Sequence, residues 1–321
     1  MNQPDTTPYQ AKSAVLFLIF NRPDTTFEVF EQIRTAKPPR LYIAADGPRE
    51  NNENDALLCE QAREVAAKVD WDCELKTLFK DENQGCRDSV SDAVTWFFDH
   101  EEEGIILEDD CLPANSFFLF CDTLLEKYRD DTRIRHITGC NFQKGNKHGD
   151  ASYYFSNRIH VWGWASWRRV WKDYDKSLEK YSSEQISDTM ANIYKDPLVV
   201  ETWTNIFEDV KAGAINSWAY PLDFVNFFNN GLVIIPNQNL IKNIGYGPDA
   251  THTQIVDEFH ERNPLQEIDE ITHPVFIVPN KQADLFIIDR DFGLEERRLK
   301  ERALKTRMKR WLRTVFRNAA L

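Results

Sequence analysis

Three consecutive acids, Glu108, Asp109 and Asp110, directly follow the apolar run at residues 104–107. Acids that come straight after a buried strand do not serve packing, and carboxylate oxygens suit Mg²⁺ or Mn²⁺ bound jointly with a diphosphate. The alternative is a solvated acidic turn that caps a helix starting near Asn115. The position after a predicted strand favours the metal.

Asp46 ends another predicted strand, where its carboxylate could accept a hydrogen bond from a base or a ribose. Asp46-Gly47-Pro48 is also an ordinary turn sequence, and taken alone that interpretation is the simpler one. Asn83-Gln84-Gly85 supplies a second turn, through which the backbone can approach a ligand closely. Both turns therefore belong to the candidate ligand site.

Arg22, Arg49 and Arg87 each lie at a predicted strand end or helix start. Guanidinium groups next to the free N–H groups of a helix N-terminus form a natural phosphate site. Surface arginines are common, so the three residues carry weight only as a group. Together with the acids they point to a phosphorylated ligand.

The elements that must position these side chains alternate between strands and helices. Strands are expected at residues 14–20, 41–45, 73–79 and 104–107, and a helical pattern follows each of the first three. This order predicts an open α/β sheet, mostly parallel, with helices on both faces and its ligand beyond the carboxyl ends of the strands. Asp46, Asn83, Arg87 and Asp110 would converge there.

The pattern of predicted elements changes after residue 150. The second half is rich in helices and loops and contains many tryptophans. Trp162 and Trp164 flank Gly163 and could frame a sugar pocket, since aromatic faces stack on sugar C–H surfaces. Of the two, Trp164 is the predicted substrate contact. We expect a donor-binding half at 1–150, an acceptor-side half at 151–294 and a basic amphipathic helix at 295–321.

The motifs together resemble the GT-A fold of nucleotide-sugar glycosyltransferases, and more closely a bacterial group related in pattern to animal N-acetylglucosaminyltransferase I. The segments that carry this resemblance are Asn21-Arg22-Pro23, Asp46-Gly47, Asn83-x-Gly85 before Arg87, Glu108-Asp109-Asp110, His160-Val-Trp-Gly-Trp-Ala-Ser-Trp167 and the stretch 239–253. The resemblance spans roughly residues 15–253. It implies a Rossmann-like donor half and a closing loop at 239–253.

The resemblance also implies roles for individual residues. Asp46 would contact the nucleoside, and Glu108 and Asp109 would orient the ribose or donor sugar. His252 would close over the diphosphate. The nucleotide and its diphosphate would be surrounded by Asn21, Arg22, Asn83, Gly85 and Arg87. Asp110 would hold a Mn²⁺ or Mg²⁺ ion that bridges the diphosphate. A divalent cation neutralises the leaving diphosphate as a Lewis acid.

One position departs from the family pattern. Where that pattern has Trp-Asp at the start of an acceptor-side helix, with the Asp as general base, this chain has Trp218-Ala219-Tyr220. Alanine cannot take a proton. Asp223, one turn further along, is the nearest candidate base. The alternatives are a sequence altered at this position and a weak or non-catalytic protein.

The charge of the chain, its cysteines and its N-terminus indicate which partners and which compartment to expect. The chain of 321 residues has 39 Lys and Arg against 52 Asp and Glu, a formal charge of -13, which would repel a nucleic-acid backbone. The six cysteines include no C-x-x-C pair, so we expect reduced, mostly buried thiols. The N-terminus lacks the pattern of a signal peptide, which predicts a cytoplasmic protein.

The segment 295–321 carries ten basic residues against three acids, with apolar residues at helical spacing. This pattern is typical of a helix attracted to anionic lipid, which would place the protein at the inner face of the cell membrane. The alternative is a helix packed on the acidic body of the protein. The two interpretations stay open.

The leading hypothesis is a metal-dependent, inverting glycosyltransferase that moves a hexosyl or N-acetylhexosaminyl unit from a nucleotide-diphosphate sugar, expected to be a UDP-sugar. Its acceptor would be a polysaccharide or a glycolipid. One alternative is a sugar-nucleotide nucleotidyltransferase, which needs a Gly-rich, Lys-bearing loop after the first strand, where this chain has Asn21-Arg22-Pro23. The other is a catalytically degenerate protein that binds sugars or nucleotides.

Overall fold

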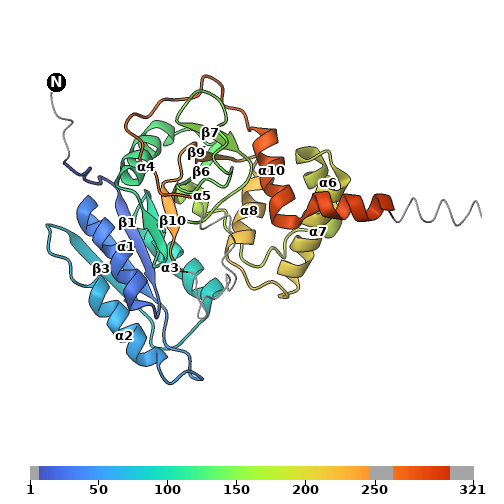
Figure 1. Cartoon of the computed structure of the whole chain (residues 1–321). Helices are drawn as coiled ribbons and strands as arrows, with labels where there is room; N and C mark the ends of the chain where they lie inside the picture. Colours follow the sequence, from blue (N-terminus) through green and yellow to red (C-terminus); the bar gives the residue numbers. More distant parts are fainter. Residues whose placement is uncertain (1–6, 246–262, 304–321) are drawn as a thin grey trace, which may run out of the picture.

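The computed structural model describes residues 7–245 and 263–303. A mixed sheet of eight strands forms the centre of the molecule, with helices on both of its faces (Figure 1). In spatial order its strands are β3 (Glu74–Phe79), β2 (Arg40–Ala45), β1 (Ala14–Ile19), β4 (Glu103–Glu108), β8 (Trp164–Trp167), β6 (Ile134–Thr138), β9 (Leu232–Pro236) and β7 (Tyr153–Ser156). The α/β fold class predicted from the sequence is confirmed.

The first four strands run parallel to one another, as the alternation of strands and helices predicts. The strands on the other side of β4 are mixed in direction: β8 pairs antiparallel with both β4 and β6, whereas β6 and β9 are parallel. The division expected near residue 150 therefore falls within one continuous sheet, because β8 of the second half lies directly beside β4 of the first.

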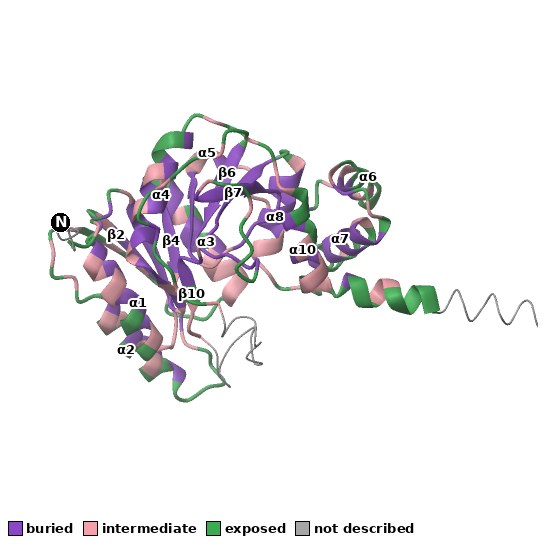
Figure 2. Cartoon of the chain, turned by 45° about the horizontal axis from the view of Figure 1, so that its top comes forward, coloured by how far each residue is buried: buried purple, intermediate pink, exposed green. Residues whose placement is uncertain are grey.

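The side chains of β1 alternate between the two faces of the sheet, which explains why helices cover both faces. Val15, Phe17 and Ile19 belong to the core beneath α1 (Pro23–Ala36), α2 (Asp55–Ala66) and α4 (Asn115–Tyr128). Ala14, Leu16 and Leu18 face the other way, towards α3 (Cys86–His100) and the short α5 (Arg168–Trp171). Because successive side chains of a strand point to opposite faces, an apolar run without polar interruptions requires a cover on each side. The buried residues in Figure 2 accordingly follow the sheet.

A third core lies among helices at one end of the molecule, away from α1 and α2 (Figure 1). It is formed by α6 (Ser183–Ile193), α7 (Pro197–Lys211), α8 (Ala219–Phe228) and α10 (Lys281–Phe292). Trp203 of α7 is fully buried and packs edge-on against Phe224 and Phe227. Ser182 and Gln185 form a capping box that starts α6. These helices extend the second half of the chain beyond the sheet.

A small second sheet lies beside the ends of the main strands. It consists of β5 (Cys111–Pro113), which follows the three acids, and β10 (Ile241–Asn243), which pairs with it antiparallel. Ile244 donates its backbone N–H to the carbonyl oxygen of Asp110 at 2.8 Å. The chain after residue 240 is thereby attached to the acidic segment.

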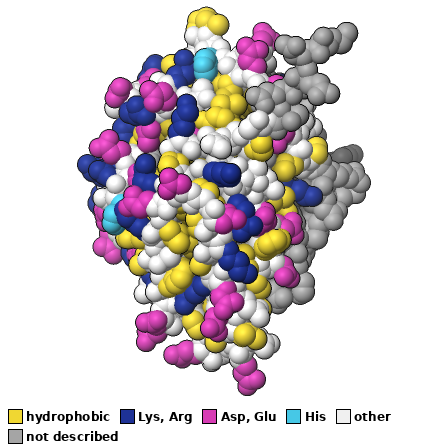
Figure 3. Space-filling view, turned by 90° about the vertical axis from the view of Figure 1, so that its left-hand side faces the viewer, with side chains coloured by type: hydrophobic (Ala, Val, Ile, Leu, Met, Phe, Trp, Pro, Cys, Tyr) yellow, Lys and Arg dark blue, Asp and Glu magenta, His cyan; other side chains and the backbone are white. Residues whose placement is uncertain are grey.

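The six cysteines all fall within the described residues, and no disulfide joins any of them. Within residues 7–245 and 263–303, no helix combines the length and the apolar character needed to cross a membrane. On the face shown in Figure 3, acidic and basic side chains are interspersed rather than gathered by sign. Most of the basic segment expected to be amphipathic, residues 304–321, lies outside the described residues.

Candidate functional site

A cavity of about 280 Å³ opens at the carboxyl ends of β1, β2 and β4, the edge of the sheet that the sequence indicates. It brings together seven of the predicted residues: Arg22, Asp46, Asn83, Gly85, Glu108, Asp109 and Asp110. Arg49 and Trp162, both candidates from the sequence, also line it. So do Asn243, from the stretch 239–253, and Phe20 and Ser89, which were not predicted. We call this space the donor-side cavity, after the role that the sequence predicts for this half of the chain.

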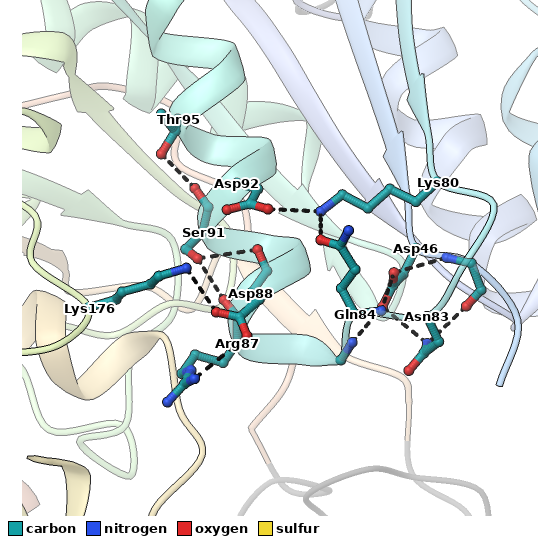
Figure 4. A network of polar contacts seen from close by, with 12 residues as sticks. Asp46, Lys80, Asn83, Gln84, Arg87, Asp88, Ser91, Asp92, Thr95 and Lys176 are labelled. Carbon is teal, nitrogen blue, oxygen red and sulfur yellow. Dashed lines mark hydrogen bonds and ion pairs between the residues drawn. The ribbon is translucent and has the colours of Figure 1, made fainter. Parts of the chain in front are cut away.

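Asp46 joins the end of β2 to the turn that precedes α3 (Figure 4). Its carboxylate accepts hydrogen bonds from the backbone N–H groups of Gly47, Gln84 and Gly85 at 2.9 to 3.2 Å. The Asn83 side-chain amide donates a further bond at 3.1 Å. Because a carboxylate has about four acceptor positions, these bonds use most of its capacity. Asp46 thus fixes the shape of the turn that walls the cavity.

The three acids have different environments at the end of β4. Asp110 Oδ2 accepts a hydrogen bond from Arg22 Nη1 at 2.9 Å, and Asp109 Oδ2 accepts the backbone N–H of Phe20 at 3.1 Å. Arg22 Nη1 also lies 3.9 Å from Asp109 Oδ1. The carboxylate of Glu108 receives no hydrogen bond from the described part of the chain. Three carboxylates therefore stand against the single guanidinium of Arg22.

The electrostatics at this turn favour a bound cation. Burial, followed by repulsion from the neighbouring carboxylates, raises the pKa values of Glu108 and Asp109, while the charge of Arg22 acts in the opposite direction. A divalent cation would relieve this repulsion, so these residues fit one. Within the described residues no cluster of three or more His, Cys, Asp or Glu side chains forms a protein-only metal site. Mg²⁺ and Mn²⁺ commonly complete such sparse sites with phosphate oxygens and water.

Gly245 closes the donor-side cavity next to the acids. A methyl group placed on Gly245 would overlap the Asp110 carboxylate and lie 2.8 Å from Arg22 Nη1. The backbone of residue 245 therefore packs directly against the Arg22–Asp110 pair. The only sequence signal for Asn243 and Gly245 was their place in the stretch 239–253.

Two residues predicted to lie near the nucleotide do not line this cavity. Asn21 donates its side-chain amide to Asp55 Oδ1 at 2.9 Å, and Asp55 also accepts Arg49 Nη2 at 2.9 Å. Asn21 and Asp55 thus hold Arg49, which does line the cavity. Arg87 pairs with Asp88 at 3.6 Å instead of facing Asp46 (Figure 4). His252 lies outside the described residues.

A second cavity, of about 260 Å³, adjoins the first, because Trp162 lines both. Ala219, Tyr220 and Asp223 of α8 line this second space, as do Arg158, His160 and Arg290. We call it the acceptor-side cavity, after the role that the sequence predicts for this half of the chain. Asp223 accepts a hydrogen bond from Arg158 Nη1 at 3.2 Å and one from the backbone N–H of Ile159 at 3.1 Å. Burial raises the pKa of Asp223 to about 6, although the charge of Arg158 opposes the rise.

Trp164 is a core residue. It is 1% exposed, and it stacks on the rings of His136 at 5.0 Å and Trp218 at 5.9 Å between centroids. A ring enclosed in this way has no face for a sugar. Trp162, two residues earlier, is half-buried and walls both cavities, so it takes the place of Trp164 as the candidate sugar contact.

No protein-family model matches the sequence, and no curated protein matches it. Among solved structures, the chain is similar to a UDP-glucose pyrophosphorylase complexed with UDP-glucose, at a TM-score of 0.32 and 10% identity over 50% of this chain and 78% of that one. For HddC from Yersinia pseudotuberculosis the TM-score is 0.31 and the identity is 10%, over 53% of this chain and 87% of that one. For a 4-diphosphocytidyl-2C-methyl-D-erythritolsynthase from Anaerococcus prevotii DSM 20548 the TM-score is 0.33 and the identity is 9%, over 68% of this chain and 96% of that one. Scores of this size carry no argument about function.

Proposed function

We propose that this protein is a metal-dependent, inverting glycosyltransferase that uses a nucleotide-diphosphate sugar. The observation that carries the proposal is the cavity at the carboxyl ends of β1, β2 and β4. There the carboxylates of Glu108, Asp109 and Asp110 lie close together beside Arg22, and Trp162 forms a wall shared with a second cavity. Two adjoining cavities suit a reaction between a donor and an acceptor. A crowded acidic turn beside a phosphate-sized space suits a metal-bound diphosphate.

In this proposal the donor-side cavity holds the nucleotide and its diphosphate. Asp110 would hold Mn²⁺ or Mg²⁺, while Glu108 and Asp109 orient the ribose or the donor sugar. When bound, the cation would stabilise negative charge on the diphosphate as a Lewis acid. Arg49, held by Asp55, supplies a positive charge within the same cavity. Asp46 acts by positioning the turn of Asn83 and Gly85.

The transfer itself needs one displacement. An acceptor hydroxyl oxygen forms a bond to the anomeric carbon, the bond from that carbon to the diphosphate oxygen breaks, and the configuration inverts. The hydroxyl proton passes to a base, for which Asp223 is the candidate because it lines the acceptor-side cavity. A carboxyl group with a pKa of about 6 is ionised at neutral pH and still accepts a proton readily.

The proposal is tested by calorimetric binding of UDP, GDP and UTP, each with and without Mn²⁺. We expect a nucleoside diphosphate to bind only weakly without Mn²⁺. Asp110→Asn should lower the Mn²⁺-dependent affinity by about 100-fold or more, because loss of even an outer-shell partner costs a metal site about 10- to 100-fold in affinity. Asp99→Asn, an exposed carboxylate on α3, is the matched control. Absence of any nucleotide binding would exclude the proposal in this form.

The sugar-nucleotide nucleotidyltransferase alternative predicts a different preference. An enzyme of that class takes a nucleoside triphosphate and a sugar phosphate, so UTP would bind more tightly than UDP. A catalytically degenerate binding protein would bind UDP with Mn²⁺ and never consume a UDP-sugar. The same titration, followed by a hydrolysis assay on the UDP-sugar, separates these outcomes.

A further inference from the structure

Three basic side chains border the acceptor-side cavity, and the reaction described above uses none of them. Arg158 and His160 come from the segment between β7 and β8, and Arg290 comes from α10. Arg290 lies far from the other two in the sequence, and the fold brings all three to the same cavity. The guanidinium groups of Arg158 and Arg290 carry the positive charge that attracts an anion, and His160 offers a ring nitrogen for a hydrogen bond.

The two guanidinium groups are held in place by the same carboxylate. Arg158 Nη2 lies 3.7 Å from Asp291 Oδ2, and Arg290 Nε donates to Asp291 Oδ1 at 2.9 Å. Arg158 also lies over the ring of Trp203 at 4.4 Å, and Arg290 over Phe142 at 4.9 Å. Aromatic faces and a shared acid fix both groups before any ligand binds, so little entropy is lost on binding.

Two buried polar atoms at this cavity have no hydrogen-bond partner among the described residues. They are Nε2 of His160, a residue that is 7% exposed, and Nε of Arg158, a residue that is 6% exposed. Buried polar groups nearly always find partners, and an exception calls for an explanation. A polar ligand in the cavity is such an explanation.

The charges of Arg158 and Arg290 act on the His160 imidazole. Burial and the charges of Arg158, Arg290 and His136 all lower the pKa of His160 well below its usual value. The imidazole is therefore neutral, and Arg158 and Arg290 both lie close enough to oppose a positive charge on it. The same guanidinium groups also pair with carboxylates, Arg158 with Asp223 at 3.2 Å and both arginines with Asp291.

The remaining wall is aromatic. Trp162 and Phe142 meet edge to face at 5.0 Å, and Phe142 and His160 do so at 4.9 Å, with Tyr220 also lining the cavity. Aromatic surfaces beside planar hydrogen-bonding groups are suited to a sugar ring, which has apolar C–H faces and polar edges. A space of about 260 Å³ is small for an extended ligand and suits one ring.

We propose that the acceptor-side cavity binds an acidic sugar unit, a hexuronic acid whose carboxylate faces Arg158 and Arg290 and whose ring lies against Trp162. The planar fork of a guanidinium matches a planar carboxylate. The inference rests on the proposed function in one respect: it makes this sugar the acceptor. It would direct the enzyme to uronate-containing glycans.

The test is ligand-observed NMR titration of the full chain with D-glucuronate, D-glucose and inorganic phosphate. Glucuronate is expected to bind at least about tenfold more tightly than glucose, the difference that one charge-assisted hydrogen-bond pair commonly makes. Arg290→Gln should abolish that preference and Arg290→Lys should leave part of it. Arg297→Gln is the matched control, because Arg297 pairs with Glu201 at 3.5 Å and does not line the cavity.

Equal affinity for glucose and glucuronate would overturn the proposal, as would tighter binding of phosphate than of glucuronate. Loss of the preference in Arg297→Gln as well as in Arg290→Gln would also overturn it, since the effect would then not belong to the cavity. Thermal unfolding of each variant separates lost binding from lost fold. Because no nucleotide is present in this titration, its failure is distinguishable from failure of the donor site.

Discussion

Gly245 lies directly against Asp110, so that any side chain on Gly245 would overlap the Asp110 carboxylate. The contact joins two segments far apart in the sequence, the acidic turn after β4 and the chain after β10. Ile244 strengthens the link by its hydrogen bond to the Asp110 carbonyl oxygen. The position of the candidate metal-binding carboxylate therefore depends on a glycine that bears no functional group.

The first prediction follows from this contact. Gly245→Ala should displace the Asp110 carboxylate or Arg22 and lower Mn²⁺-dependent UDP affinity by about tenfold or more, while overpacking costs about 1 to 3 kcal/mol of stability. Calorimetry and urea unfolding measure the two effects. Gly149→Ala is the control: its methyl group would meet no atom within 4 Å, and its φ of +73° adds backbone strain without touching the site. Unchanged UDP affinity in Gly245→Ala would contradict the prediction.

A second prediction concerns the bracing role of Asp46. Asp46→Asn keeps the shape of the side chain but replaces one acceptor oxygen by an N–H₂ group that faces other donors. We expect about 2 kcal/mol of lost stability in urea unfolding, together with weaker nucleotide binding, because the N–H groups of Gln84 and Gly85 lose an acceptor. Asp81→Asn, an exposed acid in the same turn, should change neither quantity. A fully stable Asp46→Asn protein would show that the turn does not need the carboxylate.

Trp162 and Trp164 provide a third, paired prediction. Trp164→Ala should cost about 3 to 5 kcal/mol of stability, because it removes a buried ring between His136 and Trp218. Trp162→Ala should cost less stability and should weaken both nucleotide and glucuronate binding, because Trp162 lines both cavities. Urea unfolding and the two titrations give the comparison. If Trp164→Ala weakened binding and Trp162→Ala mainly lowered stability, Trp164 would be the sugar contact after all.

A fourth prediction concerns stability at acidic pH. Burial lowers the pKa of His136 to about 4, from 6.5 for an unperturbed imidazole. Between these values the unfolded state binds a proton that the folded state does not, so stability falls as the pH falls from about 6.5 to 4. A shift of this size corresponds to about 3 kcal/mol, lost across that window.

Urea unfolding at several pH values tests this effect with two variants. His136→Gln removes the titrating ring, so its stability should fall less steeply between pH 6.5 and 4 than that of the wild type. The exposed His100 provides the control, and His100→Gln should keep the wild-type slope. Equal slopes in all three proteins would show that His136 is not the group responsible.

The sequence alone determined the first half of the fold and one edge of the site. The apolar run of β1 predicted a strand buried on both faces, and the three acids at the end of β4 predicted polar side chains at the carboxyl edge of the sheet. These predictions succeed because they rest on local periodicity and on the shared direction of parallel strands.

Other features depended on contacts that no local pattern contains. Antiparallel pairing places β8 between β4 and β6, and β10 reaches the acidic turn by pairing with β5 across more than a hundred residues. Gly163 has a φ of 57°, which interrupts the strand alternation between Trp162 and Trp164. One tryptophan therefore faces the cavities while the other enters the core. Only the tertiary structure decides this, because strand pairing and backbone handedness at a glycine are fixed by packing between distant segments.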